Sequence, residues 1–338
     1  MVKYILKRLV YIVIIAFILS FILYALYNCI DVDYAQMRLS GQEVQLQKEG
    51  RYEEVYQALR KQMALDEPLF MRYLYWMGLA PLNGEYDGLL QGNFGYSWVY
   101  KEDVINLLGD PLKNTVFINI FATALALGIT IPLGIFCAVK KGRKRDTAVQ
   151  VGSIIGYSIP TFIIAIIFIW LFAVVLGLFP VSGMGTPNAD FTGFRALLDK
   201  LYYMALPLIV MTFCSLGGMT RYVRSSMIEA LSMDCIRTAR AKGLKEKVVI
   251  YSHAWRNALI PIVTLVIGWF LGIFSGSLII ESMFGLNGLG KFYMQALNGK
   301  DFEVALALQM FYVIIGLLGN LIIDLAYGLV DPRVRVNK

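Results

Sequence analysis

Apolar residues in this chain gather into six long runs, separated by shorter polar segments. Most runs contain about 20 residues or more, the length that an α-helix needs to cross a hydrocarbon core of roughly 30 Å. The runs occupy residues 9–30, 115–139, 148–178, 204–220, 259–280 and 304–330. The pattern therefore predicts an all-α membrane protein with about six transmembrane helices. Prolines at positions 132, 160 and 207 fall within these runs, which transmembrane helices tolerate.

The longest polar segment, residues 31–111, follows the first run and predicts a small domain in water. The spacing of Val55, Leu59 and Met63 indicates an amphipathic helix, and the prolines and glycines between 68 and 95 predict turns. We therefore divide the chain into a first transmembrane helix (1–30), an insertion (31–111), a core of five transmembrane helices (112–330) and a tail (331–338). The first run is too long for a cleaved secretory signal, so we expect an uncleaved helix.

Basic residues mark one side of the predicted membrane domain. They crowd the polar connections at 140–145 and 221–256 and both chain ends, whereas the alternate short connections hold few. The positive-inside rule places both termini in the cytoplasm and the 31–111 insertion outside the cell. This topology accounts for the net charge of +7 without a nucleic-acid partner.

Composition supports a membrane class and offers little catalytic chemistry. The chain is 58% hydrophobic and 16% charged, whereas a soluble domain is about a quarter charged. The four cysteines are scattered and no histidine pair exists, so we predict neither a metal site nor a disulfide. His253, the single histidine, lacks an evident nucleophile and is expected to be structural.

The cytoplasmic connection at 225–257 has the pattern of a helical hairpin. Residues 237–242 are mostly good helix formers, and Gly243 follows where a helix end favours a positive φ. Val248, Tyr251, Trp255 and Leu259 then recur at helical spacing. We expect the small side chains of Ala239 and Ala241 to give the hairpin a surface that another protein can approach closely. Anionic lipid headgroups are an equally open partner for its cations at this point.

Several motifs, in order along nearly the whole chain, resemble one family. They are RTARAKGL (237–244), GYSIPTF (156–162), LFPVSG (178–183), HAWRNALIP (253–261), ESMFGLNGLGKF (281–292), DPRVRV (331–336), DEPLFMRYLYWM (66–77) and GNFGYS (92–97). The chain resembles the peptide-type (oligopeptide, dipeptide and nickel) permease subunits of ABC importers. It departs from the usual Leu-Pro-Asn-Thr at residues 111–115, which read PLKNT.

This resemblance implies a type I ABC importer permease fold with an extracytoplasmic insertion after the first helix. It implies that the chain forms half of a pathway in a bacterial-type inner membrane. A homologous permease, two cytoplasmic ATPases and an extracytoplasmic solute-binding protein would complete the transporter. ATP and magnesium would be used by the ATPases, and no cofactor would bind this chain.

The resemblance also assigns a role to the hairpin, as the loop that docks onto the ATPase. The residues concerned are Arg237, Thr238, Ala239, Arg240, Ala241, Lys242, Gly243 and Leu244. In the wider superfamily this loop begins Glu-Ala-Ala, with a glycine six residues after the glutamate. Here Gly243 keeps its place while Arg237-Thr238-Ala239 replaces the acidic start, as in the peptide branch.

The segment from Gly285 to Phe292 nearly matches a phosphate-binding P-loop. Phe292 stands where a Ser or Thr must reach magnesium, and the predicted position is away from cytosolic ATP. We therefore expect a turn at the outer mouth of the pathway. Glu281, just before it, is expected at a solvated helix end, as a gate or a contact for the binding protein.

Asp324 is the remaining candidate, because an ionisable residue within a span is expensive and often functional. It could line a pathway for the substrate or protons, or fix helix packing, which we favour. An ion-coupled secondary transporter using Asp324 and a membrane receptor using residues 31–111 are the alternatives. Neither explains the hairpin motif. Peptide is the expected cargo, with nickel or another small solute open.

Overall fold

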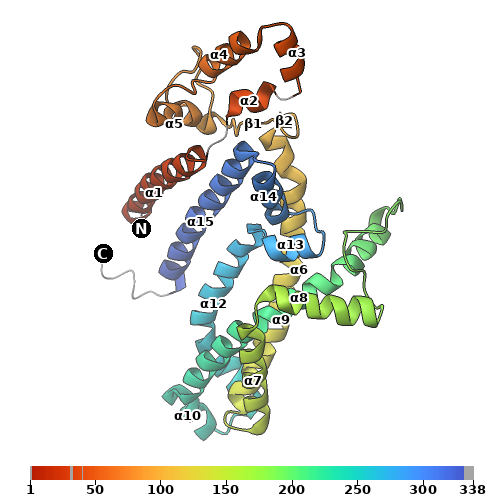
Figure 1. Cartoon of the computed structure of the whole chain (residues 1–338). Coiled ribbons are helices and arrows are strands. Elements are labelled where there is room, and N and C mark those ends of the chain that lie inside the picture. Colours follow the sequence, from red (N-terminus) through yellow and green to blue (C-terminus); the bar gives the residue numbers. More distant parts are fainter. Residues whose placement is uncertain (1, 31–32, 40, 331–338) are drawn as a thin grey trace. The chain divides into compact units, whose positions relative to one another are not determined.

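The computed structural model describes residues 2–30, 33–39 and 41–330, and it is predominantly helical (Figure 1). The predicted tail at 331–338, with its DPRVRV motif, lies outside the described residues. Strands β1 (Tyr96–Ser97) and β2 (Glu102–Asp103) pair antiparallel, with Tyr96 opposite Asp103. The fold class predicted from the hydrophobic pattern, an all-α protein with long apolar helices, is confirmed.

The described residues form two compact units, each with its own contacts. Unit 1 comprises residues 1–111 and 292–318, and unit 2 comprises residues 112–291 and 319–338, within the described ranges. Unit 1 contains α1 (Val2–Asn28), α2 (Tyr34–Leu39), α3 (Glu43–Lys48), α4 (Tyr52–Gln62), α5 (Leu69–Met77), the 3₁₀ turn η1 (Leu89–Gln91) and both strands. Helices α6 (Val104–Val139), α14 (Leu289–Asn298) and α15 (Phe302–Val330) each continue from one unit into the other.

Unit 2 contains the remaining helices. They are α7 (Lys144–Ser158), α8 (Thr161–Phe168), the π-helical η2 (Ile169–Val175), α9 (Gly193–Ser232), α10 (Asp234–Ala241), α11 (Glu246–Val248), the π-helical η3 (Val249–Ala254), α12 (Trp255–Leu271), the 3₁₀ turn η4 (Gly272–Phe274) and α13 (Leu278–Met283). Long helix α9 is the centre of this unit, because α7, α8 and α12 all pack on it.

Five helical segments in the described residues are long and apolar enough to span a membrane. They are residues 5–28, 104–139, 193–232, 246–274 and 302–325. The expected third span is not one straight helix, since α7 and the α8–η2 segment are bent by 103°. Pro160 causes the break, because the residue before a proline avoids the helical region, and Ile159 has an extended ψ of 129°. Six spans result if this bent pair counts as one.

The expected fifth span is displaced along the chain. Helix begins at Glu246 and runs to Phe274, whereas the apolar run had predicted 259–280. The first turns of this helical segment are polar, so the hydrophobicity pattern did not show where it begins. Ile280 belongs instead to the short helix α13, whose first residue follows an N-cap by Ser277.

Aromatic packing holds the insertion of unit 1 to the first helix. Tyr73 of α5 contacts both Phe21 and Tyr24 of α1, with ring centroids 5.2 and 5.7 Å apart. The Tyr73 hydroxyl also lies 2.7 Å from the buried Ser20 hydroxyl. The amphipathic helix predicted around Val55, Leu59 and Met63 is confirmed as α4.

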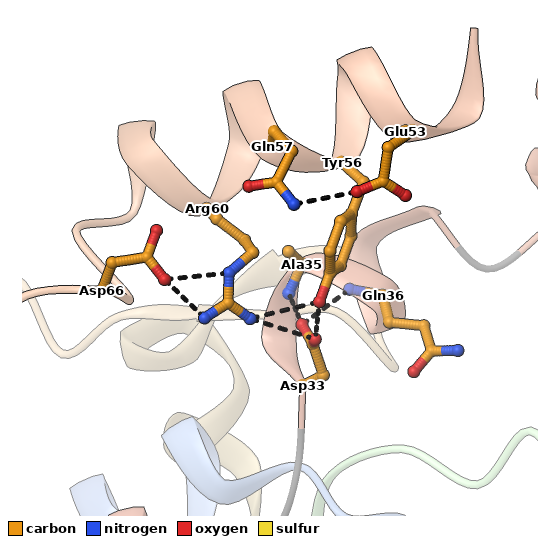
Figure 2. A network of polar contacts seen from close by, with 8 residues as sticks. All are labelled: Asp33, Ala35, Gln36, Glu53, Tyr56, Gln57, Arg60 and Asp66. Atoms are coloured by element: carbon orange, nitrogen blue, oxygen red, sulfur yellow. Dashed lines mark hydrogen bonds and ion pairs between the residues drawn. The ribbon is translucent and has the colours of Figure 1, made fainter.

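A polar network ties the start of α2 to α4 (Figure 2). The Asp33 carboxylate accepts hydrogen bonds from the Tyr56 hydroxyl and from the backbone N–H groups of Ala35 and Gln36. Arg60 bridges Asp33, at 3.3 Å, and Asp66, at 2.5 Å. These bonds hold the pKa of Asp33 below its ordinary value, against the opposing effect of burial. The network fixes the insertion without a large hydrophobic core.

Candidate functional site: the hairpin between α9 and α12

The predicted helix–glycine–helix corner is confirmed as α10, Gly243 and the helical segment from Glu246 onward. Gly243 has a φ of +74°, which favours glycine because a Cβ is strained there. The N–H of Gly243 donates to the Arg240 carbonyl and that of Leu244 to the Ala239 carbonyl. This pair of bonds is a Schellman motif, which satisfies the last carbonyls of α10 and stops the helix.

Helix α10 packs one face against the neighbouring helices of unit 2, and its other face is exposed to solvent. Ile236 and Ala239 are 0% and 6% exposed, in a core with Met227, Val249 and Ala254. Seven of the eight residues predicted for docking are exposed: Arg237, Thr238, Arg240, Ala241, Lys242, Gly243 and Leu244. The expectation that Ala239 offers a surface to a partner is wrong, because its methyl group packs against the protein's own helices. Ala241 remains available.

The charged residues of the hairpin pair with one another at its surface, within α10 and across the corner. Arg240 donates to Glu246 at 2.8 and 3.2 Å, and this bonding raises the pKa of Arg240. Arg237 lies 3.3 Å from Asp234. Both pairs are exposed, so each contributes little to stability and can be exchanged for a partner's charges.

Two long helical segments carry the hairpin. Helix α9 has 40 residues and at 1.5 Å per residue extends roughly 60 Å, about twice the thickness of a hydrocarbon core. It is therefore too long to lie wholly within the hydrocarbon core. On the other side the π-helical η3 joins the hairpin to α12, and π segments of this kind often occur at functional sites. His253, in η3, is exposed.

A partly buried ion pair, which the sequence did not predict, connects α7 to α9. Arg224 binds Asp146 through two hydrogen bonds of 2.7 Å, and the Asp146 side chain is only 3% exposed. Asp146 also accepts from the backbone N–H of Gly142. Nearby, Gly217 lets the helices approach, since a Cβ there would lie 2.6 Å from the Ser153 carbonyl oxygen. Separated by 78 residues, the pair gave no local signal in the sequence.

Glu281 is buried, which contradicts the expected solvated helix end. The residue is 3% exposed, and its carboxylate accepts from the Thr115 hydroxyl at 2.9 Å and the Lys291 N–H at 3.0 Å. Further backbone N–H donors are those of Ser277 and Gly290. Despite these four donors, burial raises the pKa of Glu281.

The P-loop-like segment wraps around this carboxylate. A Cβ at Gly288 would lie 2.4 Å from the Glu281 carboxyl carbon, so glycine is required by the close approach. The altered motif at 111–115 takes part, because Asn114 donates to the Asn287 carbonyl and Thr115 accepts from the Leu289 N–H. The anion in the glycine-rich loop is thus the protein's own side chain.

Asp324 lies in α15, in unit 2, and is partly buried. It belongs to a different element from Glu281 in α13 and from the hairpin around α10. The three predicted sites therefore lie on three different elements of unit 2.

The sequence matches two families of known membrane components. Residues 130–336 match the family described as "Binding-protein-dependent transport system inner membrane component", and residues 1–119 match its N-terminal counterpart. The chain belongs to this family. It is therefore a multi-pass permease subunit of an ABC importer, and ATP is hydrolysed by separate ATPase subunits.

Individual relatives cover most of the chain. The oligopeptide transport system permease protein AppB of Bacillus subtilis is 37% identical over 80% of this chain and 82% of its own length. The dipeptide permease DppB of Lactococcus lactis is 30% identical over 99% of this chain and all of its own length, and the di/tripeptide permease DppB of Pseudomonas aeruginosa is 32% identical over 99% of both. A solved methionine ABC transporter, MetNI, aligns with 66% of this chain and 97% of its own, at a TM-score of 0.49 and 18% identity.

Proposed function

We propose that this permease carries peptides, and that residues 237–244 dock onto an ATPase and pass its movement to the membrane helices. The observation that carries the docking role is the two-sided hairpin, with Ile236 and Ala239 buried in the core and seven neighbours exposed. Because α10 is anchored in the hydrophobic core, a force applied to its exposed face is transmitted to the neighbouring helices. The names of the relatives support peptide as the cargo.

In the proposed assembly this permease forms one half of the pathway, in line with the ABC importer family to which it belongs. A homologous permease supplies the other half, two ATPases bind the cytoplasmic hairpins, and a solute-binding protein delivers peptide from outside. Both termini lie in the cytoplasm, and residues 31–111 lie on the outer side. ATP and magnesium bind the ATPases, and this chain holds no cofactor.

Movement of the hairpin reaches the membrane by two routes. Helix α9 carries it directly, and the Asp146–Arg224 pair couples α9 to α7. The shared core with Val249, Ala254 and Ala258 couples α10 to α12. Helices α7, α9 and α12 thus respond together, and Asp324 serves packing rather than ion coupling.

Uptake by reconstituted vesicles tests this function. Vesicles holding both permeases and both ATPases, with binding protein outside and ATP inside, should accumulate labelled di- or oligopeptide. Vesicles without the ATPases should accumulate none, and an imposed proton gradient should not replace ATP. Peptide uptake driven by the gradient in the absence of ATPases would contradict the proposal.

A further inference from the structure

Unit 1 contains a cavity of about 200 Å³ that none of the preceding functions uses. Its walls come from α1, α2, α5, the beginning of α15 and the turns near Gly88 and Gly95. All of these residues belong to unit 1. The volume is below the roughly 300–1,000 Å³ of pockets for drug-sized ligands, so it suits a molecule of amino-acid or dipeptide size.

Aromatic side chains form a fixed wall of this cavity. Tyr24 packs on Trp76 with ring centroids 5.3 Å apart, and Tyr27 packs on Phe302 at 5.7 Å. Tyr24, Tyr27 and Phe302 are each less than 9% exposed. Rings locked in this way keep their faces in place, and such faces attract a cationic group.

Opposite charges lie in the same cavity. Arg72 of α5 and Glu303 of α15 both line it, and both act on Tyr34: Glu303 adds to the burial that raises the pKa of this phenol, and Arg72 opposes it. The two charges therefore lie within electrostatic range of one side chain. The Arg72 guanidinium donates to the Asn28 side chain, which leaves further N–H donors for a ligand.

Among the residues that the structure describes, the Glu303 carboxylate has no hydrogen-bond or ion-pair partner. It lies tight against the backbone, since a Cβ at Gly95 would be 2.6 Å from its Oε2 atom. Another acid, Asp301, lies within electrostatic range of it. A partly buried carboxylate next to a second carboxylate strongly favours a cation, because an unpaired buried charge is costly.

We propose that this cavity binds a small zwitterion with a primary ammonium group, with the ammonium at Glu303 and the anionic group at Arg72. An ammonium has three N–H donors for the carboxylate and the tyrosine hydroxyls, and a carboxylate or phosphate accepts from guanidinium. Free amino acids, dipeptides and the phosphoethanolamine headgroup share this chemistry. The site does not depend on which solute the transporter carries.

The test uses the full chain in its transporter complex, without the binding protein, in phosphatidylcholine nanodiscs. Calorimetric titration with L-alanyl-L-alanine and with glycerophosphoethanolamine identifies which zwitterion binds, and N-acetyl-L-alanyl-L-alanine lacks the ammonium. We expect binding of at least one zwitterion, and none of the acetylated dipeptide.

Glu303→Gln provides the decisive variant, because Glu303 has no described partner whose loss would unfold the protein. It should weaken binding about tenfold to a hundredfold, as expected for one charge-assisted hydrogen bond. Arg72→Gln should weaken binding too, whereas Glu102→Gln, an exposed carboxylate of β2 in the same unit, should leave it unchanged.

The proposal is overturned if neither zwitterion binds the wild-type complex, or if binding survives Glu303→Gln undiminished. Equal binding of the acetylated dipeptide would overturn the assigned orientation of the ligand. Peptide uptake by the wild-type complex is measured in parallel, so that failure of this site and failure of the transport function are told apart.

Discussion

Gly243 sets the direction of the hairpin through its backbone alone. Its φ is +74°, and a Cβ at this position would meet no atom within 4 Å. A substitution therefore introduces backbone strain without a steric clash. Gly50, after α3 in the insertion, has a φ of +66° and equally open surroundings, which makes it a matched control.

Gly243→Val should impair coupling in a protein that still inserts and folds. The left-handed conformation costs a non-glycine residue on the order of 1–3 kcal/mol. We therefore expect the turn at residue 243 to lose its conformation while the hydrophobic core stays folded. We expect ATPase copurification and ATP-dependent uptake to fall severalfold or more. Gly50→Val carries a comparable backbone strain and should retain both. Equal losses in the two variants would show that backbone strain, and not docking, causes the loss.

Glu281 makes stability depend on pH in an unusual direction. Burial raises its pKa in the folded protein above the unfolded value of about 4.3. The folded state then holds the proton more tightly, so this residue's contribution to stability is largest below the unfolded pKa and declines as pH rises through the folded pKa.

Thermal unfolding of wild type and Glu281→Gln between pH 4 and pH 8 checks this sign. The stability of wild type relative to the amide variant should fall as pH rises, because only wild type must ionise a buried group. Glu281→Ala should cost about 3 kcal/mol or more at every pH, since it leaves several buried donors unsatisfied. A relative stability that instead increases with pH would contradict the raised pKa.

At the scale of elements, the ion pair between α7 and α9 is the main link that the structure adds. Arg224→Gln should destabilise by about 1–3 kcal/mol, because it leaves the buried carboxylate of Asp146 without its ion-pair partner. Arg221→Gln, one turn earlier on α9 and exposed, should change stability by less than about 0.5 kcal/mol.

A double-mutant cycle with Asp146→Asn isolates the interaction from other effects of each change. The two substitutions together should cost clearly less than the sum of the single ones. Additive costs would show that the pair does not hold these two helices together.

Several elements could be predicted from the sequence because their signals are local. The apolar runs fixed the all-α class, the spacing of Val55, Leu59 and Met63 fixed α4, and Gly243 fixed the hairpin corner. Pro160 lies within an apolar run, so hydrophobicity predicted a single span but not that its backbone bends by 103°. The polar residues from Glu246 likewise concealed the beginning of the next span.

The contacts of candidate residues could not be predicted in the same way. Glu281 meets Thr115, 166 residues earlier in the chain, and Asp146 meets Arg224 across 78 residues. Ala239 and Ala241 are alike in the sequence, and only the packing of α10 on Val249 and Met227 shows which is buried. Pairings at such separations depend on tertiary structure rather than on any local pattern.

At the scale of the whole molecule, two native cysteines report the proposed orientation. Cys29, at the end of α1, and Cys235, in α10, are both exposed. In intact cells a membrane-impermeant maleimide should label Cys29 and spare Cys235. Permeabilised cells stripped of ATPase should show labelling of both, with Cys29→Ser and Cys235→Ser as the matched controls. Labelling of Cys235 in intact cells would contradict the proposed topology, because it would place the hairpin outside the cell.

Photocrosslinking from position 241 tests the central claim, that residues 237–244 dock onto the ATPase. Ala241 is exposed beside the buried Ala239, so a photoreactive phenylalanine there projects from the hairpin without disturbing the core. In an assembled, ATP-hydrolysing complex it should form an adduct with an ATPase subunit. The same group at the exposed Val181, on the predicted outer side, should form none. An active complex that gives no ATPase adduct from 241, or gives one from 181, would contradict the account.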